Sequence, residues 1–551
     1  MNTRRIQWLI ACLFLTGCWA DTAEAQRDPY DSGGPLMPEQ AAYDVTYYDL
    51  DLFVQPADST INGILTMTAR IVQPAAEIVL NLDPLLSIRS VSMASKPLAY
   101  RRRGGEVWIA FPYMKQPGEA VTVAVAYGGR PRIAPRPPWT GGFTWARTPG
   151  GAPWIATTCQ GEGADVWWPV KDHVSDKPDS MALHIRVPDP LVVATNGALR
   201  RVESRPDGTS TYHWFISTPI SAYNVALNIA PYRLVEDTLE SVAGGPFPIQ
   251  FYVLSEAYEQ GRAFMPEIKD HLRFYERTVG PYPFRADKYG VVMTPHLGME
   301  HQSMIAYGAN FNNGAMTGGV DWGFDALHHH ELSHEWWGNL VTNADWSDMW
   351  IHEGFGTYMQ ALYLEQTQGI DRYHAYLASI RDNITNRQPV ASRGSLSSKQ
   401  IYGGDIYFKG GWVLHSLRYL IGDDLLRVAI RRMAYPDPMM EKVTDGRQVR
   451  FATTDDFLHL VEGLSGKDLD WFFEVYVRTA KLPRLVTNRA GTRLELRWET
   501  PDNLPFPMPV DVQVGTEVKR VEMRDGRGVL TVPENVQPVI DPLHWVLKAE
   551  E

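Results

Sequence analysis

The spacing of apolar residues changes twice along this chain, and the two changes restrict its fold more than any other feature. From Tyr43 to about Val253 apolar and polar residues alternate, which is typical of half-buried strands. From about Ser255 to Val477 the apolar spacing is three to four residues, as in amphipathic helices. After Pro483 the alternation returns. The chain is therefore predicted to be a multidomain α+β protein.

The same two changes predict the domain boundaries. We expect an N-terminal antiparallel β domain over residues 41–254, a mainly helical domain over residues 255–482 and a small C-terminal β-sandwich over residues 483–551. Within the helical part, Phe264 to Val279 has helical spacing and Tyr289 to Met293 has the pattern of a strand. The length of 551 residues is sufficient for several separate cores.

The first residues resemble an export signal. Arg4 and Arg5 precede the apolar run Trp8–Leu15, which is too short to cross a bilayer. Two processing routes remain open: a signal peptide over residues 1–25, cleaved after Ala25, or a lipoprotein leader over residues 1–17 with a lipid on Cys18. Either route predicts an exported protein, which is periplasmic, secreted or bound to the cell surface.

No later segment reaches the 18 to 20 apolar residues of a transmembrane helix, so a lipid on Cys18 is the possible membrane anchor. Residues 26–40 are rich in Pro and Gly and predict a flexible arm. A net charge of −12 argues against nucleic-acid binding, which requires a basic surface. Three cysteines exclude a disulfide scaffold, and Cys159 is expected to be a small buried apolar residue.

The sequence His330-Glu331-Leu332-Ser333-His334 contains two histidines four residues apart. Residues at this spacing share one face of a helix, so both imidazoles can reach one metal ion while Glu331 stands beside them. A helix over Phe324–Leu340, ending at Gly338, is compatible with this role. His328 and His329 lie outside the four-residue spacing and are expected to be solvated at the start of the helix.

A catalytic zinc site needs a third protein ligand and an open position. Glu353 follows His334 after 18 intervening residues, close to the start of a second predicted helix. An antiparallel return of that helix would bring its carboxylate to the metal. His352 is the competing ligand, but it points about 100° away around the helix.

Several motifs in the chain resemble those of one family, the gluzincin alanyl aminopeptidases and leukotriene hydrolases. The metal motif and the glutamate after 18 residues are one match. The others are His296-Leu297-Gly298-Met299-Glu300-His301, similar to the exopeptidase motif; Tyr407-Phe408-Lys409-Gly410, similar to the catalytic-tyrosine motif; and Gln160, similar to a cleft glutamine of the β domain. The order of domains is also similar, so the resemblance covers nearly the whole chain after the leader.

The resemblance implies a thermolysin-like catalytic domain and a zinc aminopeptidase whose substrates are peptides with a free N-terminus. The implied site consists of one Zn²⁺ per chain on His330, His334 and Glu353, the general base Glu331, the oxyanion donor Tyr407, and a substrate site formed by Gly298, Met299, Glu300 and Gln160. Tyr402 is a further residue that could face the cleft.

Two residues depart from the family pattern. His301 and His352 stand where asparagine is usual, and the first departure affects the position of the substrate backbone. The chain also ends after the small β region, so we expect a more open site. The alternatives are a thermolysin-like endopeptidase, a zinc epoxide hydrolase, and a non-catalytic peptide-binding protein of the cell surface.

Overall fold

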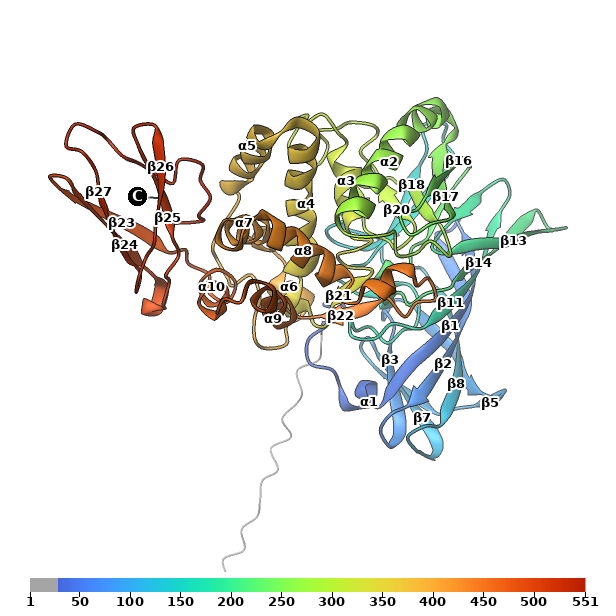
Figure 1. Cartoon of the computed structure of the whole chain (residues 1–551). Coiled ribbons are helices and arrows are strands. Elements are labelled where there is room, and N and C mark those ends of the chain that lie inside the picture. Colours follow the sequence, from blue (N-terminus) through green and yellow to red (C-terminus); the bar gives the residue numbers. More distant parts are fainter. Residues whose placement is uncertain (1–27, 551) are drawn as a thin grey trace, which may run out of the picture.

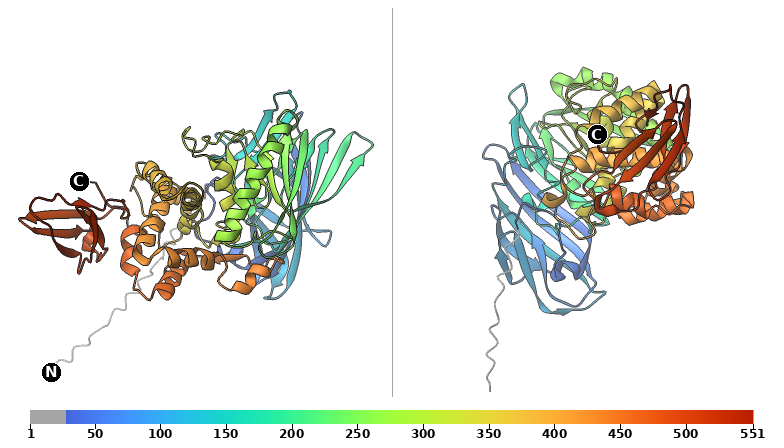
Figure 2. Two further views of the ribbon diagram at one scale, coloured as in Figure 1. Left: turned by 45° about the horizontal axis from the view of Figure 1, so that its top comes forward. Right: turned by 90° about the vertical axis from the view of Figure 1, so that its left-hand side faces the viewer.

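Three units follow one another along the computed structural model, which describes residues 28–550. The N-terminal β domain and the C-terminal β unit lie on opposite sides of a mainly helical domain (Figure 1; Figure 2, left). This arrangement confirms the predicted α+β fold and the predicted order of its parts. No helix within residues 28–550 combines the length and apolarity that a membrane span requires.

The alternating segments of the N-terminal domain form its largest sheet. In β1 the side chains of Tyr48, Leu50, Leu52 and Val54 are buried, and the residues between them are more exposed, as the alternation predicts. The β1–β11 pair is parallel and the other pairs of this sheet are antiparallel. In spatial order the strands are β13 (Ala198–Arg205), β14 (Thr209–Ile216), β11 (Ser180–Pro188), β1 (Tyr43–Gln55), β2 (Thr60–Ile71), β8 (Ala120–Gly129), β4 (Ser87–Met93) and β5 (Lys96–Pro97).

Two smaller sheets complete this domain. One contains β12 (Val192–Ala194), β15 (Asn228–Ala230), β10 (Pro153–Thr158) and β9 (Gly142–Arg147), and the other contains β3 (Ala75–Asn81), β7 (Glu106–Lys115) and β6 (Tyr100–Arg103). The end of β10 leads directly into Cys159 and Gln160, so this strand presents Gln160 to the neighbouring domain. Cys159 is buried, as predicted, and its thiol contacts the carbonyl of Tyr223 at 3.4 Å.

The predicted boundary at residue 254 is wrong. The central domain contains a five-stranded sheet with the order β16 (Tyr232–Glu240), β17 (Pro246–Leu254), β18 (Tyr289–Met293), β20 (Ile305–Tyr307) and β19 (Gly298–Met299). Residues 232–254 therefore belong to the central domain, because β17 pairs in parallel with β18. Alternation identified both strands, but it contains no information about which sheet a strand joins.

Helices form the rest of the central domain. The predicted helix around Phe264–Val279 is confirmed as α2, whereas the predicted helix Phe324–Leu340 is shorter, because α3 ends at Ser333 and hydrogen-bonded turns follow. The helices are α2 (Tyr258–Thr278), α3 (Ala326–Ser333), α4 (Trp350–Gln368), α5 (Ile370–Arg381), α6 (Ser398–Ile401), α7 (Gly404–Ile421), α8 (Asp423–Ala434), α9 (Thr454–Ser465) and α10 (Asp470–Tyr476). The short strands β21 (Val341–Asn343) and β22 (Arg450–Ala452) pair in parallel.

The C-terminal unit consists of two three-stranded sheets. They contain β23 (Arg484–Ala490), β24 (Arg493–Glu499) and β27 (Arg527–Thr531), and β26 (Glu517–Val521), β25 (Val510–Val514) and β28 (Val539–Ile540). The segment after β28 returns to the helical domain. Trp545 stacks on His415 of α7 with ring centroids 4.7 Å apart. The hydroxyl of Ser416 donates a hydrogen bond to the Trp545 carbonyl at 3.0 Å.

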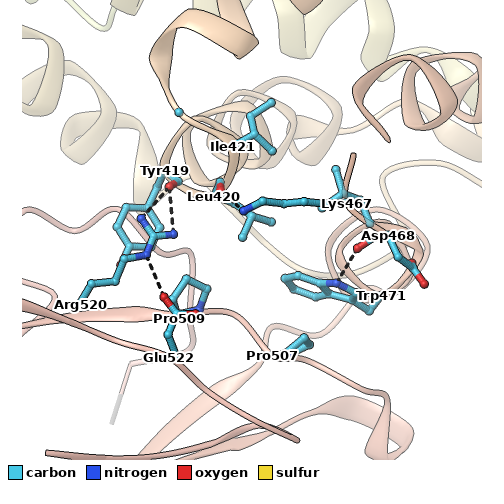
Figure 3. Close-up of a pocket in the computed structure, with 12 residues that line it drawn as sticks. Tyr419, Leu420, Ile421, Lys467, Asp468, Trp471, Pro507, Pro509, Arg520 and Glu522 are labelled. Atoms are coloured by element: carbon cyan, nitrogen blue, oxygen red, sulfur yellow. Dashed lines mark hydrogen bonds and ion pairs between the residues drawn. The ribbon is translucent and has the colours of Figure 1, made fainter. Parts of the chain in front are cut away.

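A cavity of about 610 Å³ lies between α7 and the C-terminal unit (Figure 3). Its two cationic side chains contact carbonyl groups at the end of α7: Lys467 donates to Leu420 at 3.1 Å and Arg520 donates to Tyr419 at 3.3 Å. Cations are favourable there because the last carbonyls of a helix carry partial negative charge. These cations thus stabilise the junction, at the opposite end of α7 from Tyr407.

The predicted flexible arm is also wrong where the structure describes it. Residues 28–37 lie along the border between the N-terminal and central domains, and the short helix α1 (Pro38–Ala41) leads into β1. Gly33 forms a bridge with Ser397, and the Gly34 amide donates to Leu396 at 3.0 Å. Backbone pairing with a distant segment does not depend on apolar side chains, so composition alone did not predict it. The predicted leader lies outside the described residues.

Candidate metal centre and active site

Two helices bring together the three predicted metal ligands. His330 and His334 lie on and directly after α3, and Glu353 lies in the first turn of α4. The Nε2 atoms of the histidines are 3.2 Å apart and lie 3.4 and 3.5 Å from Oε2 of Glu353. Donors at tetrahedral angles and bond lengths of about 2.0 to 2.1 Å are separated by roughly 3.3 Å, so this triangle fits zinc.

The surroundings of the triangle leave the ligand atoms of His330, His334 and Glu353 free to bind a cation. Oε2 of Glu353 is buried and has no hydrogen-bond partner within residues 28–550. Burial lowers the pKa of His330 to about 4, so its ring is neutral, as a metal ligand must be. His334 donates a hydrogen bond from Nδ1 to the Trp337 carbonyl at 2.9 Å, which leaves the lone pair on Nε2.

His328 and His329 are not solvated, contrary to the sequence prediction. Both rings are fully buried. His328 contacts the hydroxyl of Tyr289 at 2.8 Å, and His329 contacts that of Tyr275 at 3.1 Å. These tyrosines belong to β18 and α2, so their hydroxyls hold the neutral imidazoles in the interior and fix α3 in place.

Glu331 lies against the edge strand β19. A Cβ atom placed on Gly298 would be 2.5 Å from Oε1 of Glu331, so only glycine leaves room for the carboxylate there. Burial raises the pKa of Glu331 well above the usual range, and the nearby carboxylates Glu300 and Glu353 add to the effect. A carboxyl group in this environment has the raised basicity that a general base requires.

Glu300 lies in a buried cluster of polar side chains between the two domains. The side chain is 3% exposed, and its Oε1 accepts hydrogen bonds from Gln160 and, at 3.2 Å, from the Tyr223 hydroxyl. Within residues 28–550 no Lys, Arg or His side chain forms an ion pair with Glu300. Burial raises the pKa of Glu300, and the nearby His334 opposes part of this effect. Met299 precedes it on β19 and is buried.

Two tyrosines lie next to this cluster on the side of α7. The Tyr402 hydroxyl lies 2.7 Å from Oε1 of Gln160 and 3.1 Å from Oε1 of Glu353, so it links the amide of the β domain to a metal ligand. The Tyr407 hydroxyl donates to that of Tyr402 at 3.4 Å, and its ring stacks at 6.2 Å from His330. Both tyrosines are half-buried, so they remain accessible to a substrate.

Two residues in or beside this cluster were not predicted. Tyr223 contacts Glu300, and the buried ring of Trp346 lies 6.2 Å from the rings of both Tyr223 and Tyr402. Trp346 belongs to the helix-start segment before Glu353, which was the only signal that could have identified it. Tyr223 lies in the β domain and carried no local signal at all.

The two departures from the family pattern have different surroundings. His352 is buried and accepts a hydrogen bond at Nε2 from the Asn343 amide at 3.0 Å, so it faces away from the metal triangle as predicted. His301 is fully buried, and neither of its ring nitrogens has a hydrogen-bond partner within residues 28–550. Burial lowers the pKa of His301 to about 3, so the ring is neutral.

Comparison with known proteins agrees with this geometry. Residues 45–224 match the peptidase M1 N-terminal domain and residues 265–476 match the peptidase family M1 domain. A leucyl aminopeptidase of Saccharolobus solfataricus is 22% identical over 70% of this chain and 49% of its own length. Aminopeptidase N of Streptomyces lividans is 26% identical over 52% of this chain and 35% of its own length. The chain thus spans half or less of the length of these relatives.

Solved structures show the same fold. The M1 zinc metallopeptidase of Deinococcus radiodurans superposes with a TM-score of 0.65 at 24% identity, over 80% of this chain and 94% of that one. A mutant of that enzyme bound to a Tyr-Ser-Ala substrate superposes with a TM-score of 0.63, also at 24% identity, over 80% of this chain and 95% of that one. Both family domains, their order and the ligand triangle therefore agree, and the chain belongs to peptidase family M1.

Proposed function

We propose that this protein is a zinc-dependent aminopeptidase that removes the N-terminal residue from peptides. The observation that carries the proposal is the buried Glu300 carboxylate, which has hydrogen-bond donors but no cationic partner within residues 28–550. A peptide with a free α-ammonium group supplies the missing positive charge. The names of the relatives, a leucyl aminopeptidase and an aminopeptidase N, support the same activity.

The residues around the metal triangle have separate tasks in this reaction. Zinc bound there supplies Lewis acidity, which polarises a carbonyl group and lowers the pKa of water. Glu331 accepts the proton of the attacking water on its carboxylate and delivers that proton to the leaving amine. Tyr407 donates its hydroxyl hydrogen to the carbonyl oxygen as negative charge develops, and such a donor contributes about 3 kcal/mol to transition-state stabilisation.

The Glu300 cluster determines which peptide bond is cleaved. The α-ammonium binds Glu300, and Gln160 and Tyr223 keep that carboxylate in place. Because the ammonium is one residue away from the scissile bond, the cluster places the first peptide bond at the metal. An endopeptidase has no use for an anionic group at this position, and the relatives named above do not support epoxide hydrolysis or simple peptide binding.

N-acetylation of a good substrate tests this proposal. The acetylated amine is neutral and would leave the buried carboxylate unpaired, which costs roughly 3 to 5 kcal/mol, or a hundred- to several-thousand-fold in kcat/KM. Glu300→Gln keeps the shape of the side chain and removes its charge, so it should lose activity toward free peptides and retain zinc. Efficient cleavage of acetylated peptides by the wild type would refute the aminopeptidase proposal in favour of an endopeptidase.

We also propose that the protein is exported, on the strength of the leader sequence alone. Mass spectrometry of the mature N-terminus and labelling with palmitate distinguish the two processing routes. A chain that starts at Gln26 supports signal-peptide cleavage, and palmitate on Cys18 supports a lipid anchor. A mature protein that retains residues 1–17 would contradict both.

A further inference from the structure

The segment Asp31–Gly34 is part of the predicted flexible arm over residues 26–40. This four-residue segment alone is called the arm below, and it precedes both family domains and contacts each of them. Asp31 accepts hydrogen bonds from the side chains of Ser397 and Ser398, at 2.7 and 3.1 Å, and from the Lys399 amide at 3.0 Å. Ser32 donates to the Gly161 carbonyl at 3.1 Å and accepts from the Ser398 amide at 2.8 Å. The arm therefore joins α6 of the central domain to the β-domain loop that contains Gly161.

Both of these contacts are next to residues in or beside the Glu300 cluster. Gly161 directly follows Gln160, whose amide contacts Glu300. Tyr402 directly follows α6, and its hydroxyl contacts both Gln160 and Glu353. A shift of α6 relative to the β-domain loop would thus separate Gln160 from Tyr402. The arm is hydrogen-bonded to both and adds to the direct hydrogen bond from the Ser398 hydroxyl to the Gly161 carbonyl.

The arm also supports this cluster from behind. Gly33 packs against Trp346 so closely that a Cβ atom there would lie 1.9 Å from the indole ring, and its φ of +84° favours glycine as well. Trp346 in turn lies 6.2 Å from the rings of Tyr223 and Tyr402. The indole is thus enclosed between the arm and these two tyrosines, and its position depends on the backbone of Gly33.

We propose that the arm is a positioning element for the amino end of the substrate. It holds Gln160 and Tyr402 in register across the border between the two domains, without contacting the substrate itself. This inference rests on the proposed aminopeptidase function and extends it to a segment outside both family domains. Loss of the arm contacts should therefore weaken the recognition of the α-ammonium group more than the binding of groups to the metal.

Two inhibitors separate these effects in the zinc-loaded, full-length protein. Alanine hydroxamate and propanohydroxamic acid have the same metal-binding group and differ in the α-ammonium. For Asp31→Ala we expect the Ki of alanine hydroxamate to rise about tenfold, the fold-change of a weakened charged hydrogen bond, while the Ki of propanohydroxamic acid stays within about twofold. Asp31→Asn keeps an acceptor oxygen and should restore part of the loss. Zinc content and thermal unfolding are measured alongside.

Asp28→Ala is the matched control. It removes an aspartate three residues earlier, whose ion pair with Lys399 is half-exposed on both sides, and it should behave as the wild type. If Asp31→Ala raises the Ki of both inhibitors by the same factor, or raises neither, the proposal is overturned. If Asp31→Ala does not fold, the same criterion applies to the Ki values of Asp31→Asn. Equal binding of the two inhibitors by the wild type would instead refute the aminopeptidase function itself.

Discussion

Substitution of Gly298 by alanine should greatly lower the turnover of the enzyme without unfolding it. The added Cβ atom would lie 2.5 Å from Oε1 of Glu331 and 2.7 Å from Cδ1 of Leu327. A carbon and an oxygen atom in ordinary contact are about 3.3 Å apart, so the carboxylate must move back by roughly 0.8 Å. Because Oε1 of Glu331 and Cδ1 of Leu327 are both ends of flexible side chains, these movements should cost little stability.

The effect on catalysis should be much larger. A misplacement of about 1 Å in a reacting group lowers rates by about a hundredfold, which corresponds to about 2.7 kcal/mol of transition-state stabilisation. We therefore expect kcat to fall 50- to 100-fold on a free aminoacyl substrate, while zinc content stays at one per chain. The assay combines steady-state kinetics, metal analysis and thermal unfolding of the same preparations.

Gly463→Ala is the control, because a Cβ atom at this position of α9 meets no other atom within 4 Å. It should leave kcat unchanged and stabilise the helix by up to about 1 kcal/mol. Wild-type kcat in Gly298→Ala would refute the reasoning, since Glu331 could then act from a displaced position. A loss of zinc would also contradict it, because no metal ligand is predicted to move.

Three further predictions concern the metal and the buried charges. Glu331→Gln should retain zinc and lose activity, whereas Glu353→Ala should lose zinc on dialysis; the opposite pattern would exchange their roles. Tyr402→Phe should weaken zinc binding about 10- to 100-fold, measured in competition with a chelator, because Glu353 loses a hydrogen-bond donor. An unchanged zinc affinity would show that the Tyr402 hydroxyl does not support Glu353 as a ligand. Burial lowers the pKa of Lys177 to about 7, and the unfolded chain keeps this lysine protonated up to about pH 10.4, so the unfolded state binds more protons between these values. In this window the unfolding free energy should then rise with pH by up to about 1.4 kcal/mol per pH unit relative to the Lys177→Met variant, as measured by urea denaturation. If the unfolding free energies of the two proteins depend on pH in the same way, the lowered pKa of Lys177 is refuted.

Local patterns predicted the parts of the molecule that depend on local geometry. Alternation identified β1 and β2, because each buries one face, and a four-residue spacing identified His330 and His334. Glu353 followed from its place in the first turn of a return helix. These features could be predicted because each is determined by residues that are close together in the sequence.

Features that depend on distant partners could not be predicted. His328 and His329 have polar side chains, and only the tyrosines of α2 and β18 make their burial favourable. Tyr223 reaches Glu300 from another domain, and β17 joins a sheet whose next strand comes more than thirty residues later. The arm, too, is ordered by a backbone partner that lies far along the chain.

The contact between the segment after β28 and α7 is made by residues that are synthesised last. Trp545 covers His415, and the Leu547 amide donates to the Ser416 hydroxyl at 3.1 Å. A ribosome translates these residues long after it has made all three metal ligands. A nascent chain that ends before Trp545 lacks these contacts with α7, the helix that carries Tyr407. The packing of the central domain thus includes residues that lie beyond its own boundary in the sequence, and a fragment that stops at that boundary lacks them.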